Sequence, residues 1–137
     1  MAENHAGTIL VVDNDEDVLI ALERVLEEKG YATTLAVSGA EACKLLSEGS
    51  FDLLVLDDYL SDRDSVQTLA ECRSAGISSL VIVTYHRLPS LDEEARLREL
   101  GVRALVDKRA HRTLIEIVDH LLTPRWAGQR FAFDTMT

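Results

Sequence analysis

The chain has few cysteines, no long apolar run and no signal-peptide pattern. Its 137 residues include two cysteines, Cys43 and Cys72, which lie far apart, form no Cys-x-x-Cys motif and have no histidine nearby. This arrangement favours buried, reduced thiols over a disulfide or a metal site. No apolar run approaches the roughly 20 residues that cross a bilayer, and residues 1–7 lack the basic stretch and apolar core of a signal peptide. We therefore expect a cytoplasmic protein that makes no use of a membrane.

Positive charge is also scarce. The 14 lysine and arginine residues face 24 acidic residues, so the net charge is -10. Nucleic-acid binding needs a basic footprint, and this balance argues against it. An acidic surface suits contact with cations or basic partners, although plain solvation of the surface explains it as well. The length and the 47% hydrophobic fraction are ordinary for one soluble domain with a real core.

Short apolar runs alternate with segments of helical spacing along the whole chain. The runs lie near residues 8–13, 32–37, 52–57, 79–84 and 103–107. They are continuously apolar, which is typical of parallel strands buried on both faces. Five strand–helix repeats predict an α/β fold of the flavodoxin-like, doubly wound kind. We expect a five-stranded parallel sheet in the order 2-1-3-4-5, with five helices on its two faces.

The expected helices carry start and stop signals. Ser38 can cap the second helix, and Ser90 or Asp92 can open the fourth. Gly30 and Gly101 follow the first and fourth helical patterns, where a glycine commonly ends a helix. No internal repeat, low-complexity block or interior linker interrupts the pattern, so a single domain is expected.

Polar side chains stand where four of the apolar runs end. Asp13 and Asn14 follow the first run, Asp57 the third, Thr84 the fourth and Lys108 the fifth. The carboxyl ends of parallel strands meet at one edge of a sheet, and strand one lies beside strand three in the expected order. Asp13 and Asp57 should therefore face each other across a crevice. Acids, a hydroxyl and an ammonium gathered at one edge indicate a site at which an aspartate is phosphorylated.

Such a site needs a divalent cation, because an attacking carboxylate and a phosphoryl group repel each other. Mg²⁺, or Mn²⁺ in its place, prefers oxygen ligands and keeps several waters. The candidate ligands are Asp13, Asn14, Asp57 and the backbone carbonyl of Tyr59. The hydroxyl and the ammonium at the neighbouring strand ends would contact the phosphoryl oxygens.

Four stretches at the ends of the apolar runs form a recognisable set of motifs. They are Ile9-Leu10-Val11-Val12-Asp13-Asn14-Asp15, Leu53-Leu54-Val55-Leu56-Asp57, Val81-Ile82-Val83-Thr84 and Val106-Asp107-Lys108. Together they resemble the receiver domains of two-component response regulators.

The resemblance covers residues 8–122, and it implies that Asp57 takes a phosphoryl group from a histidine kinase or a histidine phosphotransfer protein in a magnesium-dependent reaction. Thr84 and Lys108 would sense the phosphate. The domain would promote its own phosphorylation and dephosphorylation only, which is not ordinary enzyme activity.

The metal site departs from the family pattern at one position. Receivers usually carry two acids after the first strand, and Asn14 stands at the second of these positions. An amide oxygen ligates magnesium without adding charge, so weaker metal binding is expected. Asp15 or Asp58 could restore the charge. In the simpler interpretation, Asp15 caps the first helix and Asp58 is only tolerated beside the acceptor.

Other departures affect the output of such a domain. The aromatic switch residue of the family is replaced by Leu105, which lacks a large ring. Tyr85 follows the threonine at a position where a small residue is usual, so its ring could crowd the site or point outward. Arg109 replaces a proline that is often cis in the family, and the loop loses that conformational lock. Ser61 and Ser65 stand where the loop after the acceptor usually has a proline and a glycine.

Two side chains occupy positions at which receivers tune the loss of phosphate. These are Tyr59 and His86. Together with Tyr85, they could shield an acyl phosphate from water. We therefore expect a long-lived phosphorylated state.

The C-terminal segment 123–137 falls outside the repeating pattern. It holds three aromatic residues, Trp126, Phe131 and Phe133. It could be a disordered tail, or the aromatics could dock on this chain or on a second copy in a homodimer. The segment leaves no room for a DNA-binding or catalytic output domain, so signalling through protein contacts to an unidentified target is expected.

Two other functions remain open. Asn14, Leu105 and Arg109 would also suit a degenerate receiver that binds partners without phosphorylation, although the retained acids, threonine and lysine argue against it. A haloacid dehalogenase-like phosphatase is the remote alternative, because residues 13–15 match its Asp-x-Asp motif. In that class the acidic pair should follow the lysine, and here the order is reversed. A flavodoxin is disfavoured because its phosphate loop could not be this acidic.

Overall fold

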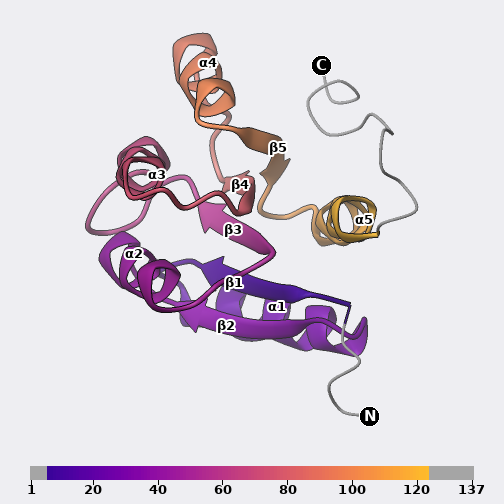
Figure 1. Cartoon of the computed structure of the whole chain (residues 1–137). Helices are drawn as coiled ribbons and strands as arrows, with labels where there is room; N and C mark the ends of the chain where they lie inside the picture. The colour runs from indigo at the N-terminus through magenta and orange to yellow at the C-terminus, as the bar shows by residue number, and fades with distance from the viewer. Residues whose placement is uncertain (1–5, 124–137) are drawn as a thin grey trace.

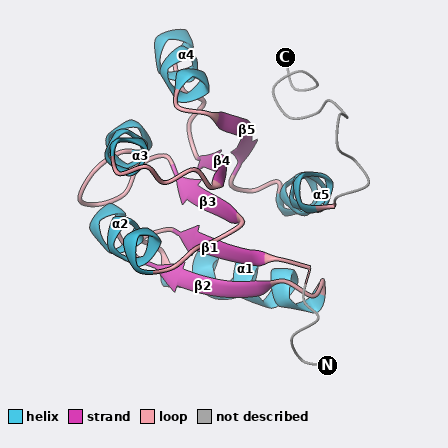
Figure 2. Ribbon diagram, in the orientation of Figure 1, coloured by secondary structure: helices cyan, strands magenta, loops and turns pink. Residues whose placement is uncertain are grey.

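A computed structural model describes residues 6–123 as a single alternation of strands and helices (Figures 1 and 2). Each predicted strand is present, with ends within one residue of those expected. The elements are β1 (Thr8–Val12), α1 (Glu16–Glu28), β2 (Ala32–Ala36), α2 (Gly39–Glu48), β3 (Leu53–Asp57), α3 (Ser65–Ser74), β4 (Leu80–Tyr85), α4 (Leu91–Glu99), β5 (Val102–Asp107) and α5 (His111–Leu122).

The strands form one parallel sheet in the order β2-β1-β3-β4-β5, as predicted. The order places β3 between β1 and β4. In the register of β3 and β4, Asp57 pairs with Thr84 at the carboxyl edge. The strand that ends in the predicted acceptor is therefore central, and its neighbours carry the other candidate residues.

Two apolar cores lie on the two faces of the sheet. The helices α1 and α5 cover one face, and α2, α3 and α4 cover the other (Figure 1). Alternate residues of each strand enter alternate cores: Ile9 and Val11 pack toward α1 and α5, while Leu10 and Val12 pack toward α2, α3 and α4. This alternation also decides which face receives each side chain at the end of a strand.

The helix ends follow the local signals in the sequence. Asp15 caps α1 by accepting the N–H of Asp17, which confirms the simpler interpretation of that acid. Ser38 caps α2, and Ser90 opens α4 in a capping box. Gly30 and Gly101, with φ of 97° and 89°, adopt the left-handed conformation that ends a helix.

The described part of the chain ends one residue after α5. The predicted tail, 123–137, lies outside the described residues apart from Thr123. None of the helices in residues 6–123 is long and apolar enough to cross a bilayer.

Candidate functional site

Four candidate residues meet on the face of the sheet covered by α1 and α5. Asp13 and Asp57 continue the side-chain alternation that places Val11 and Val55 in that core. Thr84 and Lys108 follow Ile82 and Val106 in the same way. The alternation therefore directs both acids, the hydroxyl and the ammonium to one side of the carboxyl edge, as the sequence predicts.

A bridging lysine joins the two acids. Lys108 Nζ lies 2.9 Å from Asp13 Oδ2 and 3.0 Å from Asp57 Oδ2. Both carboxylates are buried, with relative exposures of 3% and 5%. The other oxygen of Asp13 accepts the backbone N–H of Asp15 at 2.8 Å. This hydrogen bond orients the carboxylate so that Oδ2 faces the lysine and the acceptor.

The electrostatics of the site favour an additional cation. Burial raises the pKa of Asp57, and the Asp13 carboxylate raises it further, although Lys108 and the backbone N–H of Tyr59 act in the opposite direction. Burial lowers the pKa of Lys108, but its hydrogen bonds to the two acids outweigh that effect and the net shift is upward. One ammonium thus incompletely balances two buried carboxylates.

The donors fit a magnesium ion better than a softer metal. Residues 6–123 contain no cluster of three or more histidine, cysteine or acidic side chains able to hold a metal. The two carboxylates offer oxygen donors, and neutral oxygens and water could complete a shell, which is how Mg²⁺ is usually held. Asn14 is exposed beside Asp13, at a shallow depression lined also by Asp15 and Asp17. Its amide and the carbonyl of Tyr59 remain predicted ligands.

Thr84 lies next to the acceptor. It is buried and pairs with Asp57 in the register of the sheet. Its backbone carbonyl accepts the N–H of Asp58 at 2.8 Å, and this contact holds the end of β3 against β4. The strand pairing therefore positions the threonine beside Asp57.

Asp58 belongs to the opposite face, so it does not supply the charge missing at Asn14. It follows Leu54 and Leu56 in the alternation and is buried toward α3. The hydroxyl of Ser65 donates to its Oδ1 at 2.5 Å, while no donor among the described residues reaches Oδ2. Burial raises the pKa of this carboxyl. No pattern in the sequence indicated that Ser65 would pair with Asp58.

Leu105 and Tyr85 also lie on the face opposite to Asp57. Leu105 is buried in the core formed with α2, α3 and α4, where it pairs with Val83 in the sheet. Tyr85 is half-buried and packs against the same core. Its ring packs on the face opposite to the acceptor, so of the two alternatives the structure does not support crowding of Asp57 by this residue.

Tyr59 and His86, the predicted tuning residues, are exposed. The hydroxyl of Tyr59 donates to Glu93 Oε2 of α4 at 3.1 Å. Hydrogen bonds from Arg109 lower the pKa of the Asp107 carboxyl, and His86 lies close enough to that carboxyl to contribute to the shift. A role for either side chain in slowing phosphate loss stays a prediction.

An ion pair stabilises the loop where the family has a proline. The side chain of Arg109 donates to both oxygens of Asp107, from Nε at 2.8 Å and from a terminal nitrogen at 2.6 Å. Its backbone N–H donates to the same carboxylate at 2.9 Å. The guanidinium is largely exposed, so solvent screens the pair and we expect it to contribute little to stability. The turn after Lys108 is therefore constrained by an ion pair rather than by a proline.

A parallel sheet of this order with two acids and a lysine at its carboxyl edge defines a receiver-type signalling domain. The family model described as the response regulator receiver domain matches residues 9–119. The chain belongs to this family. Receiver domains of two-component systems are signalling modules rather than ordinary enzymes, and they bind Mg²⁺ at the phosphorylation site. Membership of this family leaves the phosphatase alternative without support.

Curated relatives include longer regulatory proteins. The chain is 33% identical over 129 residues to the transcriptional regulatory protein PrrA of Mycobacterium tuberculosis, covering 94% of this chain and 55% of PrrA. It is 37% identical over 86 residues to the alginate biosynthesis transcriptional regulatory protein AlgB of Pseudomonas putida, covering 62% of this chain and 19% of AlgB. The chain thus spans only part of these relatives, and their transcriptional roles belong to those whole proteins.

Solved structures show the same architecture. The receiver domain of the Francisella response regulator 1452 superposes with a TM-score of 0.78 at 26% identity, over 87% of this chain and 98% of that one. The response regulator TrrA of Thermotoga maritima, solved in complex with Mg²⁺-BeF, gives 0.72 at 27% identity, over 84% and 98%.

Proposed function

We propose that this chain is a phosphoacceptor of a two-component phosphorelay in the cytoplasm, with Asp57 as the acceptor. The donor is the phosphohistidine of a histidine kinase or a histidine phosphotransfer protein. The bridge from Asp13 through Lys108 to Asp57 is the observation that carries the proposal. A purely structural ion pair would not require two buried acids that leave one negative charge unbalanced. Signalling then proceeds through protein contacts.

The geometry supports a direct displacement at phosphorus. An oxygen of the Asp57 carboxylate forms the new P–O bond while the P–N bond to the donor imidazole breaks, and the imidazole leaves with the bonding electron pair. Lys108 already contacts Asp57 at 3.0 Å, so its ammonium is in place to pair with the negative charge of the incoming phosphoryl group. Thr84 offers a hydroxyl from the neighbouring strand. Asp13 and Asp57 would help to hold Mg²⁺, which would supply positive charge to offset the repulsion between carboxylate and phosphoryl group.

We expect this domain to signal without the movement of a large aromatic ring at the switch position. Leu105 is buried against the core of α2, α3 and α4, and an aliphatic side chain in that position has no ring to move between solvent and core. The same observation is what favours the second candidate function, an adaptor that binds partners without phosphorylation. Whether Asp57 accepts a phosphoryl group distinguishes the phosphoacceptor from the adaptor.

The proposal is tested by incubating the protein with acetyl phosphate or phosphoramidate and Mg²⁺, followed by intact mass measurement. We expect one added phosphoryl group on the wild-type chain and none on Asp57→Ala. Asp58→Asn is the matched control, because Asp58 is adjacent in sequence and buried on the other face; it should still accept phosphate. Absence of an adduct on the folded wild-type protein would support the adaptor instead.

Restoring the second acid should strengthen metal binding. Asn14→Asp adds a carboxylate beside Asp13 at an exposed position, so folding should be little affected. We expect the Mg²⁺ affinity to rise about tenfold, since affinity for hard cations increases with the charge of the ligand set. Calorimetric titration with MgCl₂ measures the change. An affinity equal to that of the wild type would mean that position 14 does not ligate the ion.

A further inference from the structure

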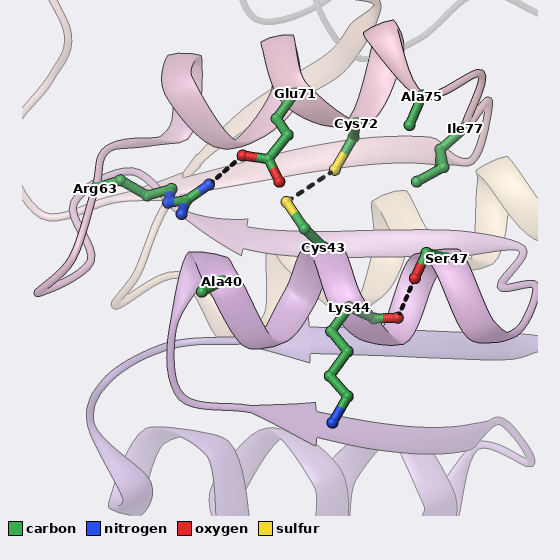
Figure 3. Close-up of a pocket in the computed structure, with 9 residues that line it drawn as sticks. All are labelled: Ala40, Cys43, Lys44, Ser47, Arg63, Glu71, Cys72, Ala75 and Ile77. Carbon is green, nitrogen blue, oxygen red and sulfur yellow. Dashed lines mark hydrogen bonds and ion pairs between the residues drawn. The ribbon is translucent and has the colours of Figure 1, made fainter.

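Folding brings together the two cysteines, which are 29 residues apart in the sequence. Both are free thiols, and their Sγ atoms lie 3.6 Å apart. Cys43 projects from α2 and Cys72 from α3, with the sulfurs pointing toward each other (Figure 3). Cys72 is buried, with 2% exposure. Cys43 is half-buried and lines a pocket of about 330 Å³ between the two helices.

The surroundings keep the pair protonated near neutral pH. Burial raises the pKa of Cys43 to about 12, with further increases from the contact with Cys72 and from the Glu71 carboxylate. Burial also raises the pKa of Cys72. Glu71 pairs with Arg63 at 2.6 Å, so the guanidinium offsets part of the negative charge of this carboxylate near Cys43. Lys44 points away from the sulfurs (Figure 3).

We propose that Cys43 and Cys72 form a modification site that low-molecular-weight disulfides of the glutathione class convert to an intramolecular disulfide. The site does not depend on phosphorylation of Asp57. The sulfurs must approach by about 1.5 Å to reach the bonding distance of a disulfide. Each sulfur is carried by a side chain with a rotatable χ1 on facing helices. Both cysteines line the pocket, but Cys43 is half-buried and Cys72 is only 2% exposed, so the reagent reaches Cys43 first.

The reaction has two exchange steps. The thiolate of Cys43 attacks the disulfide reagent, forming a mixed disulfide and releasing one reagent thiolate, which takes up the proton lost by Cys43. The thiolate of Cys72 then attacks the Cys43 sulfur, forming the protein disulfide and expelling the second reagent thiolate, which takes up the proton lost by Cys72. The protein loses two electrons and two protons, and the reagent is reduced to two thiols. Cys72 is the less exposed of the two thiols, at 2%, which sets this order of reaction.

The two steps should differ greatly in rate. The first step is slow and should accelerate about tenfold per pH unit between about pH 7 and 9, because the thiolate fraction of Cys43 rises in that proportion. The charged groups facing this thiol are Glu71 and Arg63, and they are already paired. The second step is intramolecular between adjacent sulfurs, so a mixed disulfide should not accumulate.

The test uses the whole chain, native, with glutathione disulfide at about pH 8.5, acid quenching and intact mass measurement. We expect the wild type to lose two hydrogen atoms without retaining glutathione. Cys72→Ser should retain one glutathionyl group, because it lacks the resolving thiol. Cys43→Ser should remain unmodified while folded and should react at Cys72 once unfolded in urea. Circular dichroism confirms that each variant is folded.

Three outcomes would overturn the inference. They are persistence of a glutathionyl adduct on the wild type, reaction of native Cys43→Ser at the wild-type rate, and no reaction of the folded wild type after prolonged incubation. A serine variant that does not fold is replaced by the alanine variant at the same position. The wild-type measurement decides the first and third outcomes without any variant.

Discussion

Replacing Lys108 by methionine is expected to lower the free energy of unfolding by about 3 kcal/mol at neutral pH in the absence of divalent cations. Methionine keeps part of the aliphatic stem but removes the ammonium that lies 2.9 Å from Asp13 and 3.0 Å from Asp57. Both carboxylates stay buried, with no other cationic side chain paired to them among the described residues. Removing one member of a buried charge cluster leaves the remaining charge uncompensated, which costs more than an exposed pair contributes.

The loss should depend on pH in a defined direction. Without Lys108, the facing acids can relieve their repulsion by binding a proton that the unfolded chain releases at neutral pH. The folded state then holds more protons than the unfolded state, so the free energy of unfolding falls as the pH rises. Urea denaturation in EDTA should show a larger deficit for Lys108→Met at pH 8 than at pH 5.

Two comparisons test whether the uncompensated acids cause the loss of stability in Lys108→Met. Adding Asp57→Asn to Lys108→Met should recover most of the lost stability, because only one buried acid remains. Saturating Mg²⁺ should also recover stability by binding the folded state. An equal deficit at pH 5 and pH 8, unaffected by the second substitution, would assign the effect to packing of the lysine stem.

The fold could be predicted from the sequence because its signals are local and agree with one another. The five continuous apolar runs correspond to the five strands, and residues such as Asp15, Ser38 and Ser90 cap the helices as expected. The strand order followed from assigning the repeats to the flavodoxin-like kind of doubly wound fold, whose order is 2-1-3-4-5. Asp13, Asp57, Thr84 and Lys108 could be grouped because the end of a parallel strand defines an edge of the sheet.

The sequence also encodes which face of the sheet each side chain occupies, because successive side chains of a strand point to opposite faces. Asp58 is one residue beyond Asp57 and therefore faces the other core, which rules it out as a substitute acid. Tyr85 follows Thr84 by one residue and likewise packs on the opposite side. The alternation within β3 and β4 is a signal in the sequence itself, and it suffices to exclude both residues from the site.

Contacts between distant helices could not be predicted. Cys43 and Cys72 are 29 residues apart, and their contact depends on how α2 and α3 pack together.

One local contact could not be predicted either. The pairing of Arg109 with Asp107 depends on a loop conformation for which the family resemblance offers no template, because the proline is absent. Such contacts follow from packing and rotamer choice, which have no repeating signature in the sequence.

Asp57→Asn is expected to stabilise the fold by about 1–2 kcal/mol at pH 7–8 without metal, although it removes the proposed acceptor. Burial and the Asp13 carboxylate raise the pKa of Asp57 despite the contact with Lys108. A carboxyl whose pKa is raised on folding contributes stability that is complete below its unfolded pKa of about 4 and is lost as the pH rises through its folded pKa. The neutral amide avoids this loss, so the advantage of the variant should grow with pH.

Parallel urea titrations of the wild type and Asp57→Asn between pH 4 and 8 in EDTA measure this advantage. Glu48→Gln, which also removes one negative charge but at an exposed position of α2, is the control and should show no comparable gain. If Asp57→Asn were less stable than the wild type at pH 8, the contact with Lys108 would outweigh the burial of the acid. A gain confined to Asp57→Asn would show that this position sacrifices stability for a reactive carboxylate, as expected for a residue retained for its chemistry.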